Sequence, residues 1–342
     1  MKFDFCIGNP PYQEETENEK DRANPVYDKF MDAAYQISDC VELIHPARFL
    51  FNAGQTSKAW NNKMLNDEHL KVLSYEPDAS KVFSNTEIKG GVAITLHNNK
   101  KTYEIIGTFT KFPELKTIMA KVFVSPSVRN LSEIVSPRGT YRVTDEFFEV
   151  FPFAKKRLGK GTGNMIASNF FEKIPEVWIK ASKDTEKYIG FLCRINNQRT
   201  YCYIQKEYIK DNEFLGGYNV ISPKSNGNGE FGEVLTATEL IKPMYGATDT
   251  FINIGSFDTL YEAESLTKYI KCKFFRAMLG IRKVTQDNSR DVWGMIPLQD
   301  FTDKSDIDWS KSIHEIDLQL YKKYNLSQEE IDFIESHVKE MD

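Results

Sequence analysis

The chain contains 342 residues, of which 41% are apolar and 13% aromatic, and its net charge is −5. This length predicts two domains with real cores. No run approaches the roughly eighteen apolar residues of a membrane span, and the N-terminus lacks a signal-peptide pattern, so we expect a cytoplasmic protein with no membrane partner. The acidic balance excludes a uniformly basic nucleic-acid binder, although enzymes on DNA often confine their positive charge to a cleft.

The first predicted element is a short strand over residues 3–8, which ends in Asn9-Pro10-Pro11-Tyr12, here called the Asn-Pro-Pro-Tyr turn. Two consecutive prolines have no backbone N–H and a fixed φ, so this turn is rigid and rich in acceptors. The Asn9 side-chain oxygen and the Pro10 carbonyl can accept both protons of an exocyclic amine, while the Tyr12 ring offers a flat face to an aromatic base. The residues therefore predict a pocket for a ring-bound amino group.

Residues 5–12 resemble the catalytic motif of the N6-adenine DNA methyltransferases of bacterial restriction-modification systems, including type II and type IIG methylases. The resemblance implies that Asn9 and Pro10 hold the adenine amine and that Tyr12 stacks on a flipped adenine. Two acceptors would stabilise the positive charge that develops as a sulfonium methyl group arrives. The resemblance also implies double-stranded DNA and S-adenosylmethionine as substrates, and a cognate restriction endonuclease as a further partner.

In this family, S-adenosylmethionine is held by a Gly-rich turn and an acidic residue that both precede the catalytic strand. The nearest later candidate, residues 251–257, has one glycine where the turn needs several. The cofactor half is therefore not visible in this sequence. A second polypeptide carrying that half becomes an expected partner.

The elements that follow alternate between helix and strand. Asn24 and Pro25 suit the start of a helix that continues to Ile37. A strand over 40–45, a helix over 57–66 and strands over 70–75 and 91–97 come next. The fold class is α/β: a partial Rossmann-like methyltransferase sheet, its second half, over residues 1–107, then a mixed α+β target-recognition domain over 108–300 and a helical tail over 301–342.

Two features of the first hundred residues bear on the site. Residues 82–92 resemble the hairpin beside the catalytic pocket of the methyltransferase family, and Phe109 is a candidate for the aromatic side chain opposite Tyr12. Pro77, Asp78 and the stretch 87–89 also have the outline of a magnesium-dependent nuclease. Because polar residues precede Glu87, we favour the hairpin.

Candidate DNA contacts lie in three segments of the second domain. A basic run beside glycines suits phosphate binding, a Gly-hinged loop after a strand suits base edges or phosphates, and a polar loop follows a helix predicted over 262–281. The residues are Lys155, Lys156, Arg157, Lys160, Lys224, Ser225, Asn226, Asn228, Lys283, Gln286 and Arg290. A solvated basic loop is an equally good interpretation of the first segment.

The five cysteines include no Cys-x-x-Cys pair, and the five histidines show no ligand spacing, so we expect reduced thiols and no metal site. The sequence hypothesis is an adenine-specific DNA methyltransferase, or the larger part of one. The alternatives are a non-catalytic DNA-reading fragment of a split or degraded enzyme, a protein glutamine methyltransferase, which shares the same motif, and a restriction endonuclease.

Overall fold

The computed structural model describes residues 3–15, 23–84, 88–159 and 161–341. The chain divides into two compact units. The first unit comprises Met1–Thr117, Gly229–Phe231 and Gly280–Thr285, and the second comprises Ile118–Asn228, Gly232–Leu279 and Gln286–Asp342.

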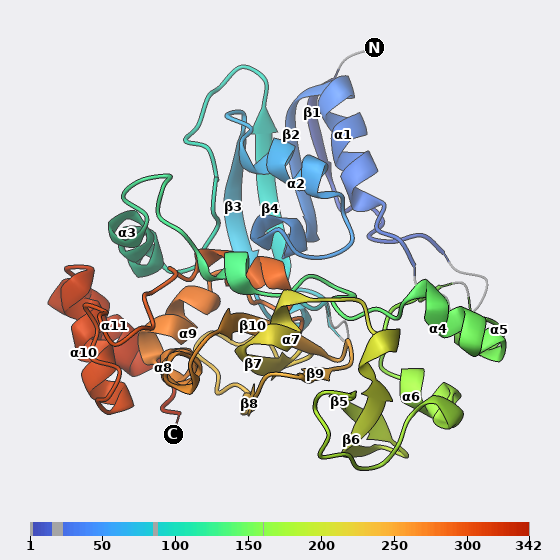
Figure 1. The fold of residues 1–342 in the computed structure, drawn as a ribbon. Coiled ribbons are helices and arrows are strands. Elements are labelled where there is room, and N and C mark those ends of the chain that lie inside the picture. The colour runs from blue at the N-terminus through green and yellow to red at the C-terminus, as the bar shows by residue number, and fades with distance from the viewer. Residues whose placement is uncertain (1–2, 16–22, 85–87, 160, 342) are drawn as a thin grey trace. The chain divides into compact units, whose positions relative to one another are not determined.

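The first unit is built on one four-stranded sheet, labelled in Figure 1. Its elements are β1 (Phe3–Gly8), α1 (Tyr27–Ile37), β2 (Ser38–Pro46), α2 (Lys58–Leu65), β3 (Leu70–Glu76) and β4 (Val92–Asn98), followed by α3 (Pro113–Val122), which crosses into the second unit.

The strand order in this sheet is β1-β2-β4-β3. Strands β1 and β2 are parallel, with Phe5 opposite Cys40, and α1 makes the crossover between them. Strand β4 runs antiparallel to both of its neighbours, β2 and β3. The predicted succession of strands and helices is therefore confirmed, and the fold is mixed α/β.

Helices α1 and α2 lie together on one face of this sheet (Figure 1), over a core that includes Met31, Phe49 and Met64. Cys6 of β1 packs against the same core. Because successive side chains of a strand point to opposite faces, Phe5 and Ile7, which flank Cys6, face away from this core. Phe5 is 72% exposed and Ile7 is 79% exposed.

The start of α1 differs from the prediction. The helix begins at Tyr27, and its N-cap residue Val26 makes no side-chain capping bond. Asn24 instead donates from Nδ2 to Glu14 Oε2, at 3.0 Å. The prediction that Asn24 caps the helix with Pro25 at its first position is therefore wrong, because both residues pair with the chain that follows the Asn-Pro-Pro-Tyr turn.

The second unit contains two three-stranded sheets, of order β10-β7-β8 and β6-β5-β9. Its helices and strands, in chain order, are α4 (Asp145–Val150), α5 (Pro152–Leu158), α6 (Phe170–Lys173), β5 (Tyr188–Ile195), β6 (Gln198–Gln205), α7 (Glu213–Gly216), β7 (Tyr218–Pro223), β8 (Glu239–Ile241), β9 (Tyr245–Ala247), β10 (Phe251–Phe257), α8 (Leu260–Lys271), α9 (Lys273–Leu279), α10 (Ile313–Lys323) and α11 (Gln328–His337).

In the second unit, β5 and β6 form a hairpin, joined at Asn196 and Asn197 with φ of 49° and 62°. Cys193 and Cys202 are disulfide-linked across these two strands. The expectation that all thiols are reduced is therefore wrong for this pair. Adjacent antiparallel strands bring the two side chains together, which their spacing in the sequence does not reveal.

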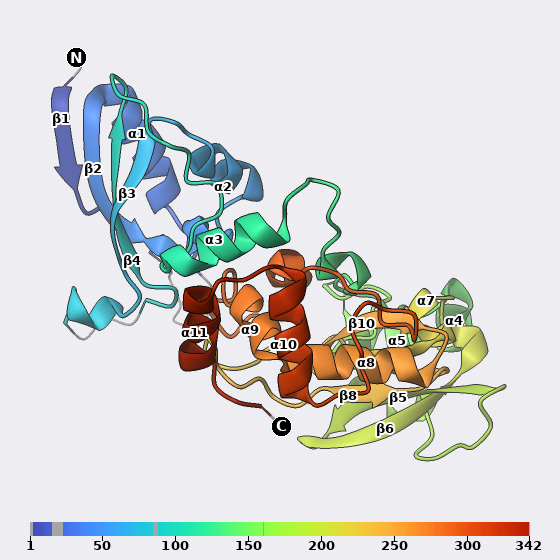
Figure 2. The same ribbon diagram turned by 90° about the vertical axis from the view of Figure 1, so that its left-hand side faces the viewer.

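The C-terminal tail packs on the second unit, where α10 contacts α8 and α9, and α11 contacts α9, as Figure 2 shows. Ser327 and Glu330 form a capping box at the start of α11, as their Ser-x-x-Glu spacing indicates. Within the described ranges, every helix falls short of the length and apolarity that crossing a membrane requires.

The helix predicted over 262–281 is interrupted at Cys272, whose backbone is extended. The cause lies in α10: both oxygens of the Asp317 carboxylate accept backbone N–H bonds at the start of α9, from Lys273 and Phe274, each at 2.9 Å. Asp317 is buried, and desolvation raises the pKa of its carboxyl to about 6. A side chain about 45 residues further along the chain therefore sets this helix end.

Replacing Asp317 tests this account. Asp317→Ala leaves two buried N–H groups without acceptors, so we expect the free energy of unfolding to fall by about 2–4 kcal/mol. Asp317→Asn keeps an acceptor oxygen and removes the buried charge, so the free energy of unfolding should fall by only about 1 kcal/mol. Urea unfolding at neutral pH measures both variants, and equal losses would contradict the capping role.

Candidate functional site

The Asn-Pro-Pro-Tyr turn leaves the sheet directly after β1 and is held in place by the segment that precedes α1. The Tyr12 carbonyl accepts a hydrogen bond from Val26 N–H at 3.2 Å, and Glu14 N–H donates to the Asn24 carbonyl at 2.9 Å. Two prolines cannot donate such bonds, so the contacts on the C-terminal side anchor the turn.

This turn lies at the edge of the sheet where β1 and β2 both end. The parallel register pairs Gly8 with Leu43, so the exits of the two strands are close together. After β2, the Ala47 N–H donates to the Gly91 carbonyl at 3.0 Å and ties this edge to the start of β4. Ligands of open α/β sheets bind at the carboxyl ends of parallel strands, and the turn occupies that position.

The two predicted acceptors are available for a ligand. The Asn9 side chain is exposed. In the described part of the chain, no hydrogen bond is made to its oxygen or to the Pro10 carbonyl. One carboxamide oxygen and one carbonyl can receive the two protons of a single amino group.

The aromatic partner of Tyr12 is Phe83. Their ring centroids are 6.4 Å apart with an interplanar angle of 69°. Phe109 instead packs edge-on against Phe51 and Tyr75, with centroid separations of 5.3 and 5.5 Å. The structure therefore places Phe83, and not Phe109, beside the turn. The resemblance of residues 82–92 to a hairpin by the catalytic pocket was the signal that pointed to Phe83.

The Tyr12 hydroxyl is buried, and it has no hydrogen-bond partner among the described residues. Burial accordingly raises the pKa of Tyr12 above its ordinary value. The phenol oxygen therefore makes no stabilising hydrogen bond in the described chain, and Tyr12 contacts Phe83 through its ring. This agrees with a stacking role that needs an aromatic face and no hydroxyl.

The structure describes only part of the nuclease outline. The Asp78 carboxylate accepts bonds from Ser80 N–H and Oγ–H, at 3.1 and 2.6 Å, which lower its pKa. Glu87 lies outside the described residues. Elsewhere in the described chain, no group of three or more His, Cys, Asp or Glu side chains could hold a metal ion.

In the second unit, the two loops predicted to contact DNA lie side by side. Asn226 N–H donates to the Gln286 carbonyl at 2.8 Å, and Asn288 N–H donates to the Lys224 carbonyl at 2.9 Å. The buried Asn288 side chain also donates to the Ser222 hydroxyl at 3.1 Å. Segments about 60 residues apart therefore form one surface.

The residues on these loops are not equally placed. Ser225, Asn228, Gln286 and Arg290 are exposed, and Lys224 is half-buried. Asn226 is buried, and its oxygen accepts a bond from Thr236 N–H at 2.7 Å, so its side chain braces the loop.

Two of the other residues predicted to contact DNA interact with groups of the protein itself. The Lys283 ammonium is buried in the first unit, where it donates to the Thr285 carbonyl at 3.2 Å. In the basic run, Arg157 is paired with Glu176 at 2.7 Å. Lys155 and Lys156 are exposed on α5, and Lys160 lies outside the described residues.

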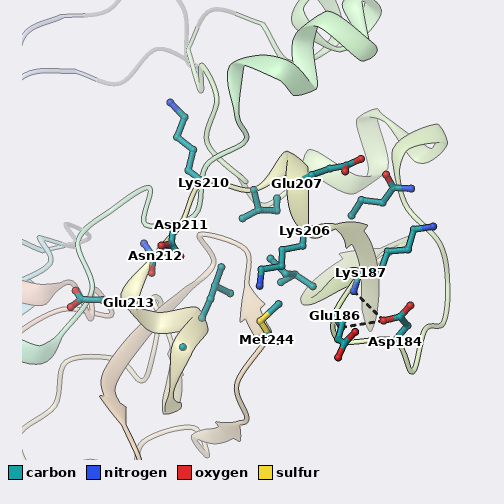
Figure 3. Close-up of a pocket in the computed structure, with 15 residues that line it drawn as sticks. Asp184, Glu186, Lys187, Lys206, Glu207, Lys210, Asp211, Asn212, Glu213 and Met244 are labelled. Atoms are coloured by element: carbon teal, nitrogen blue, oxygen red, sulfur yellow. Dashed lines mark hydrogen bonds between the residues drawn. The ribbon is translucent and has the colours of Figure 1, made fainter.

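A large groove of about 990 Å³ in the second unit does not match the predicted DNA contacts (Figure 3). Five carboxylates and three lysines line it, which makes it net acidic. They are Asp184, Glu186, Glu207, Asp211, Glu213, Lys187, Lys206 and Lys210. A net acidic lining repels a phosphate backbone, so we place no DNA strand there.

The stretch that the sequence offered as the nearest candidate for a cofactor-binding turn does not form one. The nearest sequence candidate, Phe251–Phe257, forms β10, which pairs antiparallel with β7. The helix after it, α8, has its N-terminus closed by a capping box of Thr259 and Glu262.

Comparisons with known proteins find a match that includes the Asn-Pro-Pro-Tyr turn. Residues 1–83 match the family model of the Eco57I restriction-modification methylase. An uncharacterized adenine-specific methylase of Mycoplasma pneumoniae (strain ATCC 29342 / M129 / Subtype 1) is 28% identical over 143 residues, which cover 40% of this chain and 34% of that protein. Residues 1–83, which include the Asn-Pro-Pro-Tyr turn, are thus similar to restriction-modification methylases, and the resemblance noted at that turn is confirmed.

Two solved structures also resemble the chain. The type IIL restriction-modification enzyme MmeI, in complex with DNA, aligns with 98% of this chain and 56% of its own, at 11% identity and a TM-score of 0.42. The type IIG restriction endonuclease BpuSI aligns with 93% of this chain and 48% of its own, at 9% identity and a TM-score of 0.33. The chain thus spans about half of these structures and about a third of the curated relative.

Two substitutions of Tyr12 measure the contributions of its ring and of its hydroxyl to stability separately. Tyr12→Phe removes a buried, unpartnered oxygen, so the free energy of unfolding should be unchanged or higher by up to about 1 kcal/mol. Tyr12→Ala removes the ring and should lower it by about 1–2 kcal/mol. Urea unfolding and hydrogen exchange of the β1 amides report both changes. Destabilisation by Tyr12→Phe would show a hydrogen bond to the hydroxyl.

Proposed function

We propose that this chain carries the amine pocket and the DNA-reading surface of an adenine-specific DNA methyltransferase that methylates N6 in duplex DNA. The observation that carries the proposal is the Asn-Pro-Pro-Tyr turn, whose two acceptors are unengaged within the described chain and whose aromatic side chain lies beside Phe83. The match of residues 1–83 to a restriction-modification methylase family supports it.

The chemistry follows from the acceptors. The adenine amine is conjugated with its ring and is a poor nucleophile. Hydrogen bonds from its two protons to Asn9 Oδ1 and the Pro10 carbonyl draw the nitrogen toward tetrahedral geometry, and they stabilise the positive charge that develops on it. Tyr12 and Phe83 hold the flipped base by aromatic contact. S-adenosylmethionine, when bound, supplies an electrophilic methyl group.

Asn9 is the residue to change first. Asn9→Ala removes one acceptor at the reacting amine, so we expect methylation to fall by about 100-fold or more. DNA affinity should change less than about threefold, because base and phosphate contacts elsewhere are retained. The assay measures tritium transfer to an adenine-containing duplex, in the presence of the polypeptide that supplies the cofactor half.

A matched control uses Asn62, an exposed asparagine on α2. Asn62→Ala should methylate like the unaltered chain. Turnover retained by Asn9→Ala would remove the assigned role, and adenine methylation absent from the unaltered complex would remove the proposed function.

We further propose that a second polypeptide completes the sheet at β1 and carries the cofactor site. Parallel strands are normally covered on both faces, yet Phe5 and Ile7 of β1, which pairs in parallel with β2, are largely exposed. Strand β1 also ends the strand order, so its outer edge is unpaired among the described residues. In the alternative case, a non-catalytic DNA-reading fragment, no cofactor site would form when this surface is covered.

Calorimetric titration separates these two cases. We expect no micromolar binding of S-adenosylmethionine to the isolated chain, and binding after addition of the polypeptide encoded directly upstream. Ile7→Lys places a charge on the exposed face and should weaken the complex at least tenfold. Val124→Lys, at a position that is 77% exposed in the second unit, is the control. Micromolar binding to the chain alone would contradict the split site.

A further inference from the structure

The second unit contains a cavity of about 390 Å³ beside the two adjoining loops described above. Its size is within the usual range for specific ligand pockets. Lys224 and Arg290 of those loops line it, together with the turn of residues 136–141 and the approach to β10. The turn was not among the segments that the sequence predicted to contact DNA.

The walls of this cavity carry three cations and three carboxylates. They are Arg138, Lys224, Arg290, Asp249, Asp287 and Asp291. A clamp for phosphate alone would hold an excess of positive charge. Equal numbers of fixed donors and acceptors instead suit a ligand that presents both, as the edge of a base pair does.

Arg138 is the cation best presented to a ligand. Its side chain is 72% exposed, and its Nε lies 3.9 Å from Asp249 Oδ2, which is only 17% exposed. The carboxylate can orient the guanidinium without covering the nitrogens of its fork. Arg290, in comparison, already donates from Nε to the Ser132 carbonyl at 2.7 Å.

The backbone that carries Arg138 is held rigidly. Gly139 has a φ of +71°, and a Cβ there would lie 2.7 Å from the Met165 sulfur. The Thr140 hydroxyl donates to the Pro137 carbonyl at 2.6 Å. Upstream, the Ser136 hydroxyl oxygen accepts the N–H of Asn253 in β10 at 2.8 Å. A rigid support reduces the entropy that a long side chain loses on binding.

We propose that Arg138 is a specificity-determining residue that reads a guanine base edge in duplex DNA, with Asp249 positioning its guanidinium. The guanidinium fork matches the O6 and N7 acceptors of guanine, which lie side by side in the major groove. Lys224 and Arg290 contact the adjoining phosphates. This inference rests on the proposed DNA-reading function and identifies the base that the second unit recognises.

Selection from a duplex library of random sequence tests the inference with the full chain and its partner. The unaltered protein should enrich a motif containing guanine, and Arg138→Ala should lose the preference at one guanine position by about tenfold or more. Arg138→Lys, which cannot form the fork, should lose most of it as well. Arg194→Ala, an exposed arginine on β5 that does not line the cavity, should leave the motif unchanged.

Three outcomes would overturn the assignment. An unchanged motif for Arg138→Ala means that this residue does not read the site. A uniform loss of affinity with a salt slope smaller by about one unit means a phosphate contact. Binding of free guanosine monophosphate that depends on Arg138 means a mononucleotide pocket. Failure of the unaltered protein to enrich any motif would instead count against the proposed DNA-reading function.

Discussion

The architecture of the candidate site depends on one backbone constraint, the pair of prolines that follows β1. Neither Pro10 nor Pro11 has an N–H, so the chain cannot continue the sheet and leaves it with unpaired carbonyls. The prolines stiffen the turn but give it no N–H bond to neighbouring segments, so the turn needs an anchor. The bonds of Tyr12 and Glu14 to the segment before α1 provide it. The turn is therefore both rigid and available to a ligand, which is what recognition of an amine requires.

In the second unit, buried asparagine side chains hold two loops in place. Asn226 and Asn288 are both buried, and they tie two loops into one surface through backbone and side-chain bonds. Buried polar groups that are paired stabilise a particular arrangement of the chain. The exposed side chains around them are then presented from a fixed frame. Because the turn that carries Arg138 lines the same cavity as Lys224 and Arg290, the proposed recognition surface depends on the packing of three segments.

The exposed face of β1 in the first unit would link the two proposed functions. A parallel pair of strands with helices on one face leaves apolar side chains of β1 exposed. A polypeptide that covers them would also bring a cofactor to the edge where Asn9 lies. Division of the reaction between two chains would make methylation depend on their association, while DNA reading stays with the chain described here.

Local chemistry determined much of this protein from the sequence alone. The alternation of strands and helices in the first unit, the Ser327 capping box and the Asn-Pro-Pro-Tyr turn follow from periodicity, capping residues and proline geometry, which act over a few neighbouring residues. The tertiary structure decided the rest. Phe83 stands beside Tyr12, Asp317 interrupts a helix about 45 residues earlier, Cys193 meets Cys202, and Asn226 and Lys283 are buried. These outcomes depend on contacts between segments distant along the chain, and the pattern of either segment by itself does not contain them.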